Sequence, residues 1–293
     1  MRHLALSLCL ALAASLASLG QTAAETIRLG DRWYDIVLPD SPEGAPLILA
    51  LHGGGGDPAQ FASSSGFGRA AATKGYAVVF PAGSGRRGER LLTWNGGYCC
   101  GYAARQGVDD IGFLKQVIAD AASRFGVDGT GVYLTGMSNG SIMAETFAAK
   151  NPRLVRAVAG VSGTMDTRAV AVRGQVPALI IHGTADTMVP YSGGQGDTSL
   201  TRTDFASVAA VVEAFLAPWG RVSGSSRTVD RKDDGTSVVV TDHAKGDRVV
   251  LRLITVEGGA HHWPGGRKAR LSEGKTQEID ANTEILRFFA LHR

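Results

Sequence analysis

The most constraining stretch of this chain runs from Val132 to Ala144, where β-favouring residues lead into the pattern Gly-x-Ser-x-Gly and a helix-compatible run follows. A strand that turns sharply into a helix holds a serine at the tip of the turn, with its hydroxyl clear of the sheet. Gly136 and Gly140 would let strand and helix pack closely around Ser138. Because a chain with 39 glycines can contain this pattern by chance, the rest of the sequence must decide whether Ser138 is a nucleophile.

Continuous apolar runs elsewhere indicate strands buried on both faces of a parallel sheet. They alternate with segments of helical spacing, which predicts one α/β domain with a mostly parallel sheet covered by helices on both faces. Strands are expected at 46–51, 76–80, 132–137, 155–161 and 176–181, helices at 57–74, 110–124, 139–150, 203–216 and 279–291, and hairpins at 25–45 and 237–254. Only about 15 residues separate Val161 from Val176, so no large cap domain is expected there.

Residues 1–24 resemble a secretory signal peptide. A short basic start precedes an apolar run from Leu4 to Leu19, and small residues end at Ala24. The run is too short to be a membrane anchor. We therefore expect a signal peptide at 1–24, a catalytic domain at 25–293, and secretion to the periplasm or the extracellular space.

Charge and cysteine content limit the kinds of partner and cofactor that this chain is expected to bind. The formal net charge is +3, and no run of lysines and arginines indicates nucleic-acid binding. We expect a monomer that does not bind a membrane after signal cleavage.

Loss of Cys9 would leave Cys99 and Cys100, which either form a disulfide between neighbours or stay buried and reduced. Two adjacent cysteines without a spaced partner do not predict a metal site, and no cofactor is expected.

Polar residues follow several of the expected strands, at the edge where ligands of parallel sheets bind. Ser138, then Asp186, then a histidine is the order of an acyl-transfer triad on such a sheet. A histidine takes the proton of the serine near neutral pH, and a carboxylate orients its ring. His261 and His262 are both candidates for the base, since spacing alone does not decide between them. His52, before the glycines of the first buried strand, is expected to be structural.

Backbone N–H groups must stabilise the negative charge that develops in such a reaction. Asn139, directly after the serine, is one expected donor. The second is expected at Gly54, with Gly55 as the alternative, in the glycine run 53–56. This run does not match a phosphate loop, because Asp57 and Pro58 follow it instead of Gly-Lys-Ser/Thr.

With these residues in place, the chain resembles the esterase and poly(3-hydroxybutyrate) depolymerase family of α/β-hydrolases, which includes feruloyl and acetylxylan esterases. The matching strings are 51–54 (LHGG), 94–96 (WNG), 99–101 (CCG), 107–113 (GVDDIGF), 136–140 (GMSNG), 182–186 (HGTAD) and 261–265 (HHWPG). The resemblance implies Ser138 as nucleophile, Asp186 as acid and His261 as base, because the family pattern is His-x-Trp-Pro. It also implies that Trp94 and Trp263 line the substrate cleft.

The resemblance implies a secreted serine carboxylesterase that forms an acyl-enzyme, with hydroxyalkanoate oligomers or polyester as substrate. Feruloyl or acetylxylan esters of plant cell walls are the alternative, and acyl transfer to a cell-envelope sugar is a further one. No polymer-binding domain is expected after Arg293, which favours soluble oligomers. Many relatives carry a further cysteine pair in the segments that match 219–226 and 242–246, and this chain has no cysteine there. An activity that increases toward alkaline pH is expected, since the base must be neutral.

Overall fold

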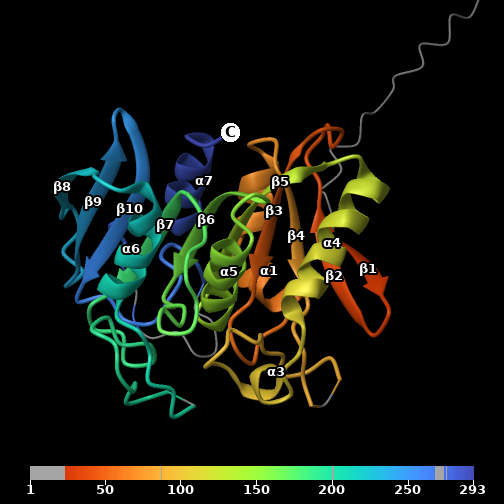
Figure 1. Ribbon diagram of the computed structural model, residues 1–293, viewed down its shortest axis with the longest axis horizontal. Coiled ribbons are helices and arrows are strands. Elements are labelled where there is room, and N and C mark those ends of the chain that lie inside the picture. The colour runs from red at the N-terminus through yellow and green to blue at the C-terminus, as the bar shows by residue number, and fades with distance from the viewer. Residues whose placement is uncertain (1–23, 87, 200, 268–273, 275) are drawn as a thin grey trace, which may run out of the picture.

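Ten strands form one sheet in the computed structural model, which describes residues 24–86, 88–199, 201–267, 274 and 276–293 (Figure 1). The strands are β1 (Glu25–Leu29), β2 (Arg32–Val37), β3 (Pro46–Leu51), β4 (Ala77–Pro81), β5 (Asp128–Met137), β6 (Val155–Val161), β7 (Ala178–Gly183), β8 (Ser223–Val229), β9 (Ser237–Lys245) and β10 (Arg248–Glu257). Their order is β1-β2-β4-β3-β5-β6-β7-β10-β9-β8. The run from β4 to β10 is parallel, and antiparallel strands flank it on both sides. The expected mostly parallel sheet is confirmed.

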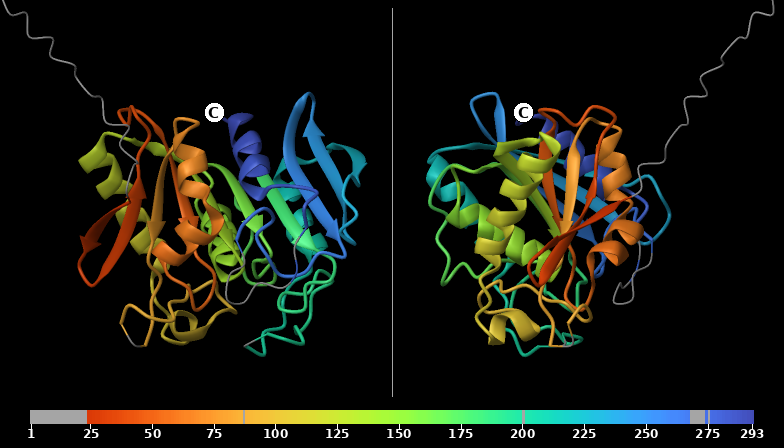
Figure 2. Two further views of the ribbon diagram at one scale, coloured as in Figure 1. Left: turned by 180° about the vertical axis from the view of Figure 1, so that it is seen from behind. Right: turned by 90° about the vertical axis from the view of Figure 1, so that its right-hand side faces the viewer.

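Helices cover both faces of the sheet (Figures 1 and 2). They are α1 (Pro58–Ser65), α2 (Phe67–Ala72), α3 (Gly101–Arg105), α4 (Asp110–Phe125), α5 (Asn139–Lys150), α6 (Val208–Leu216) and α7 (Ala281–Ala290), with a 3₁₀ turn at Ala217–Trp219. α4, α5 and α6 pack on one face, and α1, α2 and α7 on the other. A separate apolar core therefore lies on each face.

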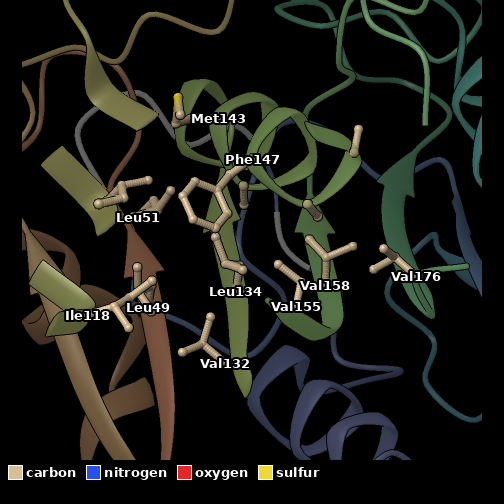
Figure 3. Close-up of a cluster of buried hydrophobic side chains, with 14 of the residues drawn as sticks. Leu49, Leu51, Ile118, Val132, Leu134, Met143, Phe147, Val155, Val158 and Val176 are labelled. Carbon is tan, nitrogen blue, oxygen red and sulfur yellow. The ribbon is translucent and has the colours of Figure 1, made fainter. Parts of the chain in front are cut away.

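The core beneath α5 shows why the central strands are apolar throughout. Leu49 and Leu134 of neighbouring strands, Val158 of β6 and Phe147 of α5 have essentially no exposed surface. They meet in one cluster between the helix and the sheet (Figure 3). Each large side chain buried in this way contributes about 1.5–3 kcal/mol to folding. The nucleophile region is thus mounted on a rigid part of the molecule.

Four elements differ from those expected. The short helix α3 (Gly101–Arg105) was not expected. The helix expected at 57–74 is two helices, because Gly66 takes a φ of 64° that ends α1. The last-but-one helix starts at Val208 and not at Thr203, since the Ser207 hydroxyl caps it by accepting the Ala210 N–H at 3.1 Å. β8 was not expected at all: its residues are polar and exposed, and pairing with β9 holds it at the edge of the sheet.

His292, two residues after the end of α7, packs against the body of the molecule. Only 6% of its surface is exposed. Its carbonyl accepts the Tyr133 hydroxyl at 2.9 Å, and its ring packs on Phe288. The end of the chain is therefore docked beside β5.

The carboxyl ends of the parallel strands meet at one edge of the sheet, at the bottom of Figure 1. The loop that carries α3 and the loop between β7 and α6 both lie below that edge. The connection 162–177 contains no helix or strand, so no cap domain is inserted there. In the described part of the chain, no helix has the length and apolarity needed to cross a membrane. The expected signal peptide, apart from Ala24, lies outside the described residues.

Candidate active site

Ser138 lies at the tip of the turn between β5 and α5, in a strained backbone conformation. Its φ of 56° and ψ of −123° are values that residues with a Cβ seldom adopt outside functional sites. Its N–H donates to the Val161 carbonyl at 2.8 Å, which fastens the turn to β6. A Cβ at Gly136 would collide with Gly140, and one at Gly140 with the carbonyl of Leu51. The sharp turn therefore requires both glycines, and it leaves Ser138 partly exposed.

Asp186 is held by its own loop after β7. Its Oδ1 accepts the backbone N–H groups of Met188 at 2.9 Å and Val189 at 2.8 Å. Its Oδ2 lies 2.8 Å from Nδ1 of His261. With only 4% of the residue exposed, this carboxylate has one fixed orientation and faces the histidine ring.

The loop after β10 presents His261 to Asp186. The Gly259 carbonyl accepts the Ala185 N–H at 2.9 Å, which ties the two loops together. A Cβ at Gly183 would collide with Gly259, so the close approach depends on these glycines. Because an ionised carboxylate only accepts hydrogen bonds, Nδ1 of His261 carries the proton and Nε2 keeps a lone pair. His261 is thus in the tautomer that a general base requires.

Neighbouring contacts bring the serine and histidine loops to the same place. Ser138 bonds to Val161 at the end of β6, and the hydroxyl of the next residue, Ser162, donates to the His262 carbonyl at 3.2 Å. Asp186 and His261 are in direct contact. Ser138 is linked to the histidine loop only indirectly, through Val161, Ser162 and His262. These contacts place the loops of Ser138 and His261 side by side, and the roles of the three residues as a triad stay predictions.

Two histidines hold Asp186 in its ionised form. Burial alone raises the pKa of this carboxyl, but hydrogen bonds from His182 and His261 lower it further than burial raises it. The net pKa lies well below the ordinary value for aspartate. His182 itself donates from Nε2 to the Val189 carbonyl at 2.8 Å, which supports the loop of Asp186.

The other histidine candidate, His262, supports the loop instead of facing the acid. Its Nδ1–H donates to the Ala260 carbonyl at 2.8 Å, and its Nε2 accepts the Thr276 N–H at 3.2 Å. Burial is the main cause of its lowered pKa. Both ring nitrogens therefore have backbone partners, and neither is left for proton transfer.

The glycine loop after β3 lies against the start of α5. A Cβ built on Gly54 would be 3.5 Å from the Cβ of Asn139. The Gly55 N–H donates to the Leu92 carbonyl at 2.8 Å, and the Gly56 N–H to the Gly53 carbonyl at 3.1 Å. Among the residues that the structure describes, the Gly54 N–H has no such partner. Of the two glycines proposed from the sequence, Gly54 is the one that can serve an oxyanion.

The side chain of Asn139 forms a contact that the sequence did not reveal. Its Oδ1 accepts the Trp94 N–H at 2.7 Å, and its Nδ2 donates to the Trp94 carbonyl at 3.0 Å. Asn139 is only 2% exposed. This two-sided hydrogen bond joins the long loop before α3 to the residue whose N–H is the first expected oxyanion donor.

Trp94 is a correction to the expected cleft. It has no exposed surface, and its indole N–H donates to the His52 carbonyl at 3.0 Å. Nε2 of His52 accepts the Gly83 N–H at 3.0 Å, so its Nδ1–H donates to the Gly53 carbonyl at 2.8 Å. Burial lowers the pKa of His52 to about 4, which keeps the ring neutral. Trp94 and His52 thus position the glycine loop, and Trp94 does not line a cleft.

Trp263 is also packed in the core. Its ring is 6% exposed and lies edge-on to Phe61 and Phe67. Its indole N–H donates to Asn282 at 2.9 Å. A tryptophan gains most by burying its ring and pairing its N–H, and the motif alone does not say which way the ring faces. Trp263 also borders a pocket together with His262 and residues 276–280, and its place in the substrate cleft stays a prediction.

Cys99 and Cys100 are joined as a disulfide between adjacent residues. Cys99 packs with Ile142, Val189 and Phe205 in a small apolar group, here called the elbow cluster. Ile142 stands four residues after Ser138, and its N–H donates to the Ser138 carbonyl at 3.0 Å. The sequence signal for the elbow cluster was the spacing of four residues between Ser138 and Ile142.

The described residues contain no group of three or more His, Cys, Asp and Glu side chains arranged to hold a metal ion.

Known proteins resemble this chain over most of its length. The sequence model of the family described as Esterase PHB depolymerase matches residues 33–174. A protein named as an esterase, NocK of Nocardia uniformis subsp. tsuyamanensis, is 30% identical over 260 residues, which are 78% of this chain and 68% of NocK. Feruloyl esterase B of Piromyces equi is 26% identical over 224 residues, 74% of this chain but 39% of that enzyme.

Among solved structures, the acetyl xylan esterase from Aspergillus awamori superimposes with a TM-score of 0.58 at 15% identity. The match covers 92% of this chain and 99% of that one. At this identity the likeness bears on the fold alone. It confirms the α/β-hydrolase fold expected from the sequence.

Proposed function

Because this chain belongs to the esterase and PHB depolymerase family of carboxylic ester hydrolases, we propose that it is a secreted serine carboxylesterase that hydrolyses 3-hydroxyalkanoate oligomers or polyester through an acyl-enzyme. The observation that carries the chemistry is the fixed pair of Asp186 and His261 at 2.8 Å, beside the strained Ser138. Secretion follows from the expected signal peptide at 1–24.

In the first half of the reaction, Oγ of Ser138 attacks the carbonyl carbon of the ester and its proton passes to Nε2 of His261. Asp186 stays ionised and stabilises the imidazolium that forms. The N–H groups of Asn139 and Gly54 stabilise the oxyanion, where one donor is worth about 10²–10³ in rate. The carbon–oxygen bond of the alcohol then breaks, and the alkoxide takes the proton from His261.

In the second half, a water molecule attacks the acyl-enzyme and gives a proton to His261. The bond to Ser138 breaks, the acid leaves, and the serine regains its proton from the histidine. Two alternative functions share these steps and differ in the acyl group or in the molecule that accepts it. Feruloyl or acetylxylan ester hydrolysis is supported by the likeness to feruloyl esterase B; acyl transfer would replace water by a cell-envelope sugar.

The test begins with Ser138→Ala and 4-nitrophenyl acetate. Loss of the nucleophile is expected to lower kcat by several orders of magnitude, since the residual rate comes from the oxyanion donors alone. Ser63→Ala on α1 is the control, because Ser63 is exposed on the far face of the sheet. Turnover by the Ser138→Ala variant at the wild-type rate would exclude the proposed mechanism.

The substrate class is tested with a panel of 3-hydroxybutyrate oligomers, polyester film, methyl ferulate and acetylated xylan. The highest kcat/KM is expected on the oligomers, and a clear preference for methyl ferulate or acetylated xylan would replace the proposal by the alternative. Repeating the assay with added sugars and analysing the products separates hydrolysis from acyl transfer. Sequencing the exported protein from its N-terminus should give Glu25 as the first residue.

A further inference from the structure

A pocket of about 450 Å³ opens between two loops at the catalytic edge of the sheet. Tyr98, Cys100 and Arg105, in and beside α3, line one side. Arg168 and the segment 201–204 line the other. Figure 1 shows α3 and the loop between β7 and α6 below the carboxyl ends of the strands. We call this space the arginine pocket.

The arginine pocket lies next to the candidate active site. Tyr98 and Cys100 pack against the elbow cluster, which includes Ile142 and Val189. The Ile142 N–H bonds to the Ser138 carbonyl at 3.0 Å, and Val189 belongs to the loop that holds Asp186. The pocket and the catalytic residues therefore lie on either side of the elbow cluster, at the same edge of the sheet. A substrate that occupies both has to run over the partly buried Tyr98, Cys100 and Met188, which cover this cluster.

Three arginines and one aspartate give the arginine pocket a positive charge. Arg168 is engaged by Asp204 at 2.6 Å and by Asp166 at 3.5 Å. In the described ranges, Arg105 and Arg202 form no ion pair, and both are exposed. Two guanidinium groups thus remain free for a ligand, and their planar donors match a carboxylate.

The hydroxyl of Tyr98 fixes the wall between the two sites. It donates to the Thr164 carbonyl at 2.6 Å and accepts the Ala206 N–H at 3.3 Å. Its ring lies edge-on to Phe205. The wall next to the elbow cluster is apolar, whereas Arg105 on one side of the pocket and Arg202 on the other supply positive charge. This suits a substrate with an apolar ester segment and a terminal negative charge.

We propose that the arginine pocket binds a carboxylate of the substrate, remote from the ester bond that Ser138 cleaves. The inference rests on the proposed ester hydrolysis and names its substrate class as acid-terminated esters. An oligomer of a 3-hydroxy acid has a free carboxylate at one end. A uronic acid side group on a plant polysaccharide ester supplies the same chemistry from a second source.

The experiment compares kcat/KM for 3-hydroxybutyrate trimer as the free acid and as its methyl ester. Wild type is expected to prefer the acid about fivefold, the scale of a partly exposed ion pair, and added sodium chloride should reduce this ratio. The double variant Arg105→Gln/Arg202→Gln should lose the preference. Arg105→Lys/Arg202→Lys should keep part of it, because the charges remain while the planar donors are lost.

The matched control is Arg69→Gln/Arg153→Gln, which removes two exposed arginines from α2 and from the opposite end of the sheet. It should keep the wild-type ratio. A second arm uses acetylated xylo-oligosaccharides with and without glucuronic acid. A preference confined to that arm, and lost in the Arg105→Gln/Arg202→Gln variant, would assign the carboxylate to the polysaccharide source.

Failure of the two proposals can be told apart. A wild-type protein that does not turn over 4-nitrophenyl acetate would refute ester hydrolysis itself. A protein that turns it over, yet uses acid and neutral forms equally in both arms, would refute the arginine pocket alone. A preference that survives in the Arg105→Gln/Arg202→Gln variant would do the same.

Discussion

Replacing Glu145 by glutamine should remove a loss of stability that builds up as the pH rises from about 5 to about 8. Glu145 lies on α5, two turns after the nucleophile, and is only 1% exposed. Its Oε2 accepts the Met165 N–H at 2.8 Å, and its Oε1 lies 3.2 Å from the Ser141 hydroxyl. Burial raises the pKa of Glu145 to about 8, although these two hydrogen bonds oppose the increase. The side chain is thus protonated at neutral pH.

The direction of the pH effect follows from the two states of the chain. Below the ordinary pKa of 4.5, Glu145 is protonated in both the folded and the unfolded state. As pH rises from there to about 8, the unfolded chain releases its proton while the folded protein keeps it, so the free energy of unfolding decreases. At 1.36 kcal/mol per pH unit, the decrease between pH 5 and pH 9 is about 4 kcal/mol.

Glutamine has the shape of the protonated acid and does not titrate. In Glu145→Gln the amide oxygen can accept the Met165 N–H, and the amide nitrogen can donate to the Ser141 hydroxyl. The variant should therefore gain about 4 kcal/mol relative to wild type between pH 5 and pH 9, since all other titrating groups cancel in the difference.

Urea unfolding of both proteins at pH 5, 7 and 9 measures this gain. Glu213→Gln is the matched control, because Glu213 is exposed on α6, and its stability should follow that of wild type. Parallel stability profiles for wild type and Glu145→Gln would show that Glu145 does not retain its proton in the folded protein, and would refute the reasoning.

Three further predictions concern the active site. His261→Ala should lower kcat on 4-nitrophenyl acetate nearly as far as loss of the nucleophile, while His262→Ala should be much milder; the reverse ranking would assign the base to His262. Asn139→Ala leaves the buried Trp94 N–H unpaired, while the Trp94 carbonyl keeps the Cys100 N–H as a donor. It should therefore cost about 1–3 kcal/mol in urea unfolding and lower kcat more than it changes KM; an unchanged kcat would limit Asn139 to a structural role. Titration of the unfolded, unreduced protein should find no free thiol at Cys99 and Cys100, and two thiols would exclude the disulfide.

The local sequence was sufficient wherever a residue's role depends on its own neighbours in the chain. Apolar runs such as 46–51 identified the buried strands, since a strand covered by helices on both faces must be apolar throughout. The glycines around Ser138 indicated the sharp turn, since only glycine permits the close backbone approach there. β8 was missed for the converse reason: its polar residues carry no such pattern, and only pairing with β9 makes it a strand.

The same distinction between local sequence and tertiary contacts applies to the candidate site. The sequence by itself determined the order of Ser138, Asp186 and the histidine loop, and with it the class of fold. Tertiary structure decided which histidine faces the acid, that Trp94 and Trp263 are core residues, and that Asn139 clamps the loop before α3. Side-chain direction depends on which loops meet in space, and residues such as Asn139 and Trp94 are 45 positions apart, beyond the reach of any local pattern. The arginine pocket has the same origin, because its free arginines come from two loops that only the folded sheet brings together.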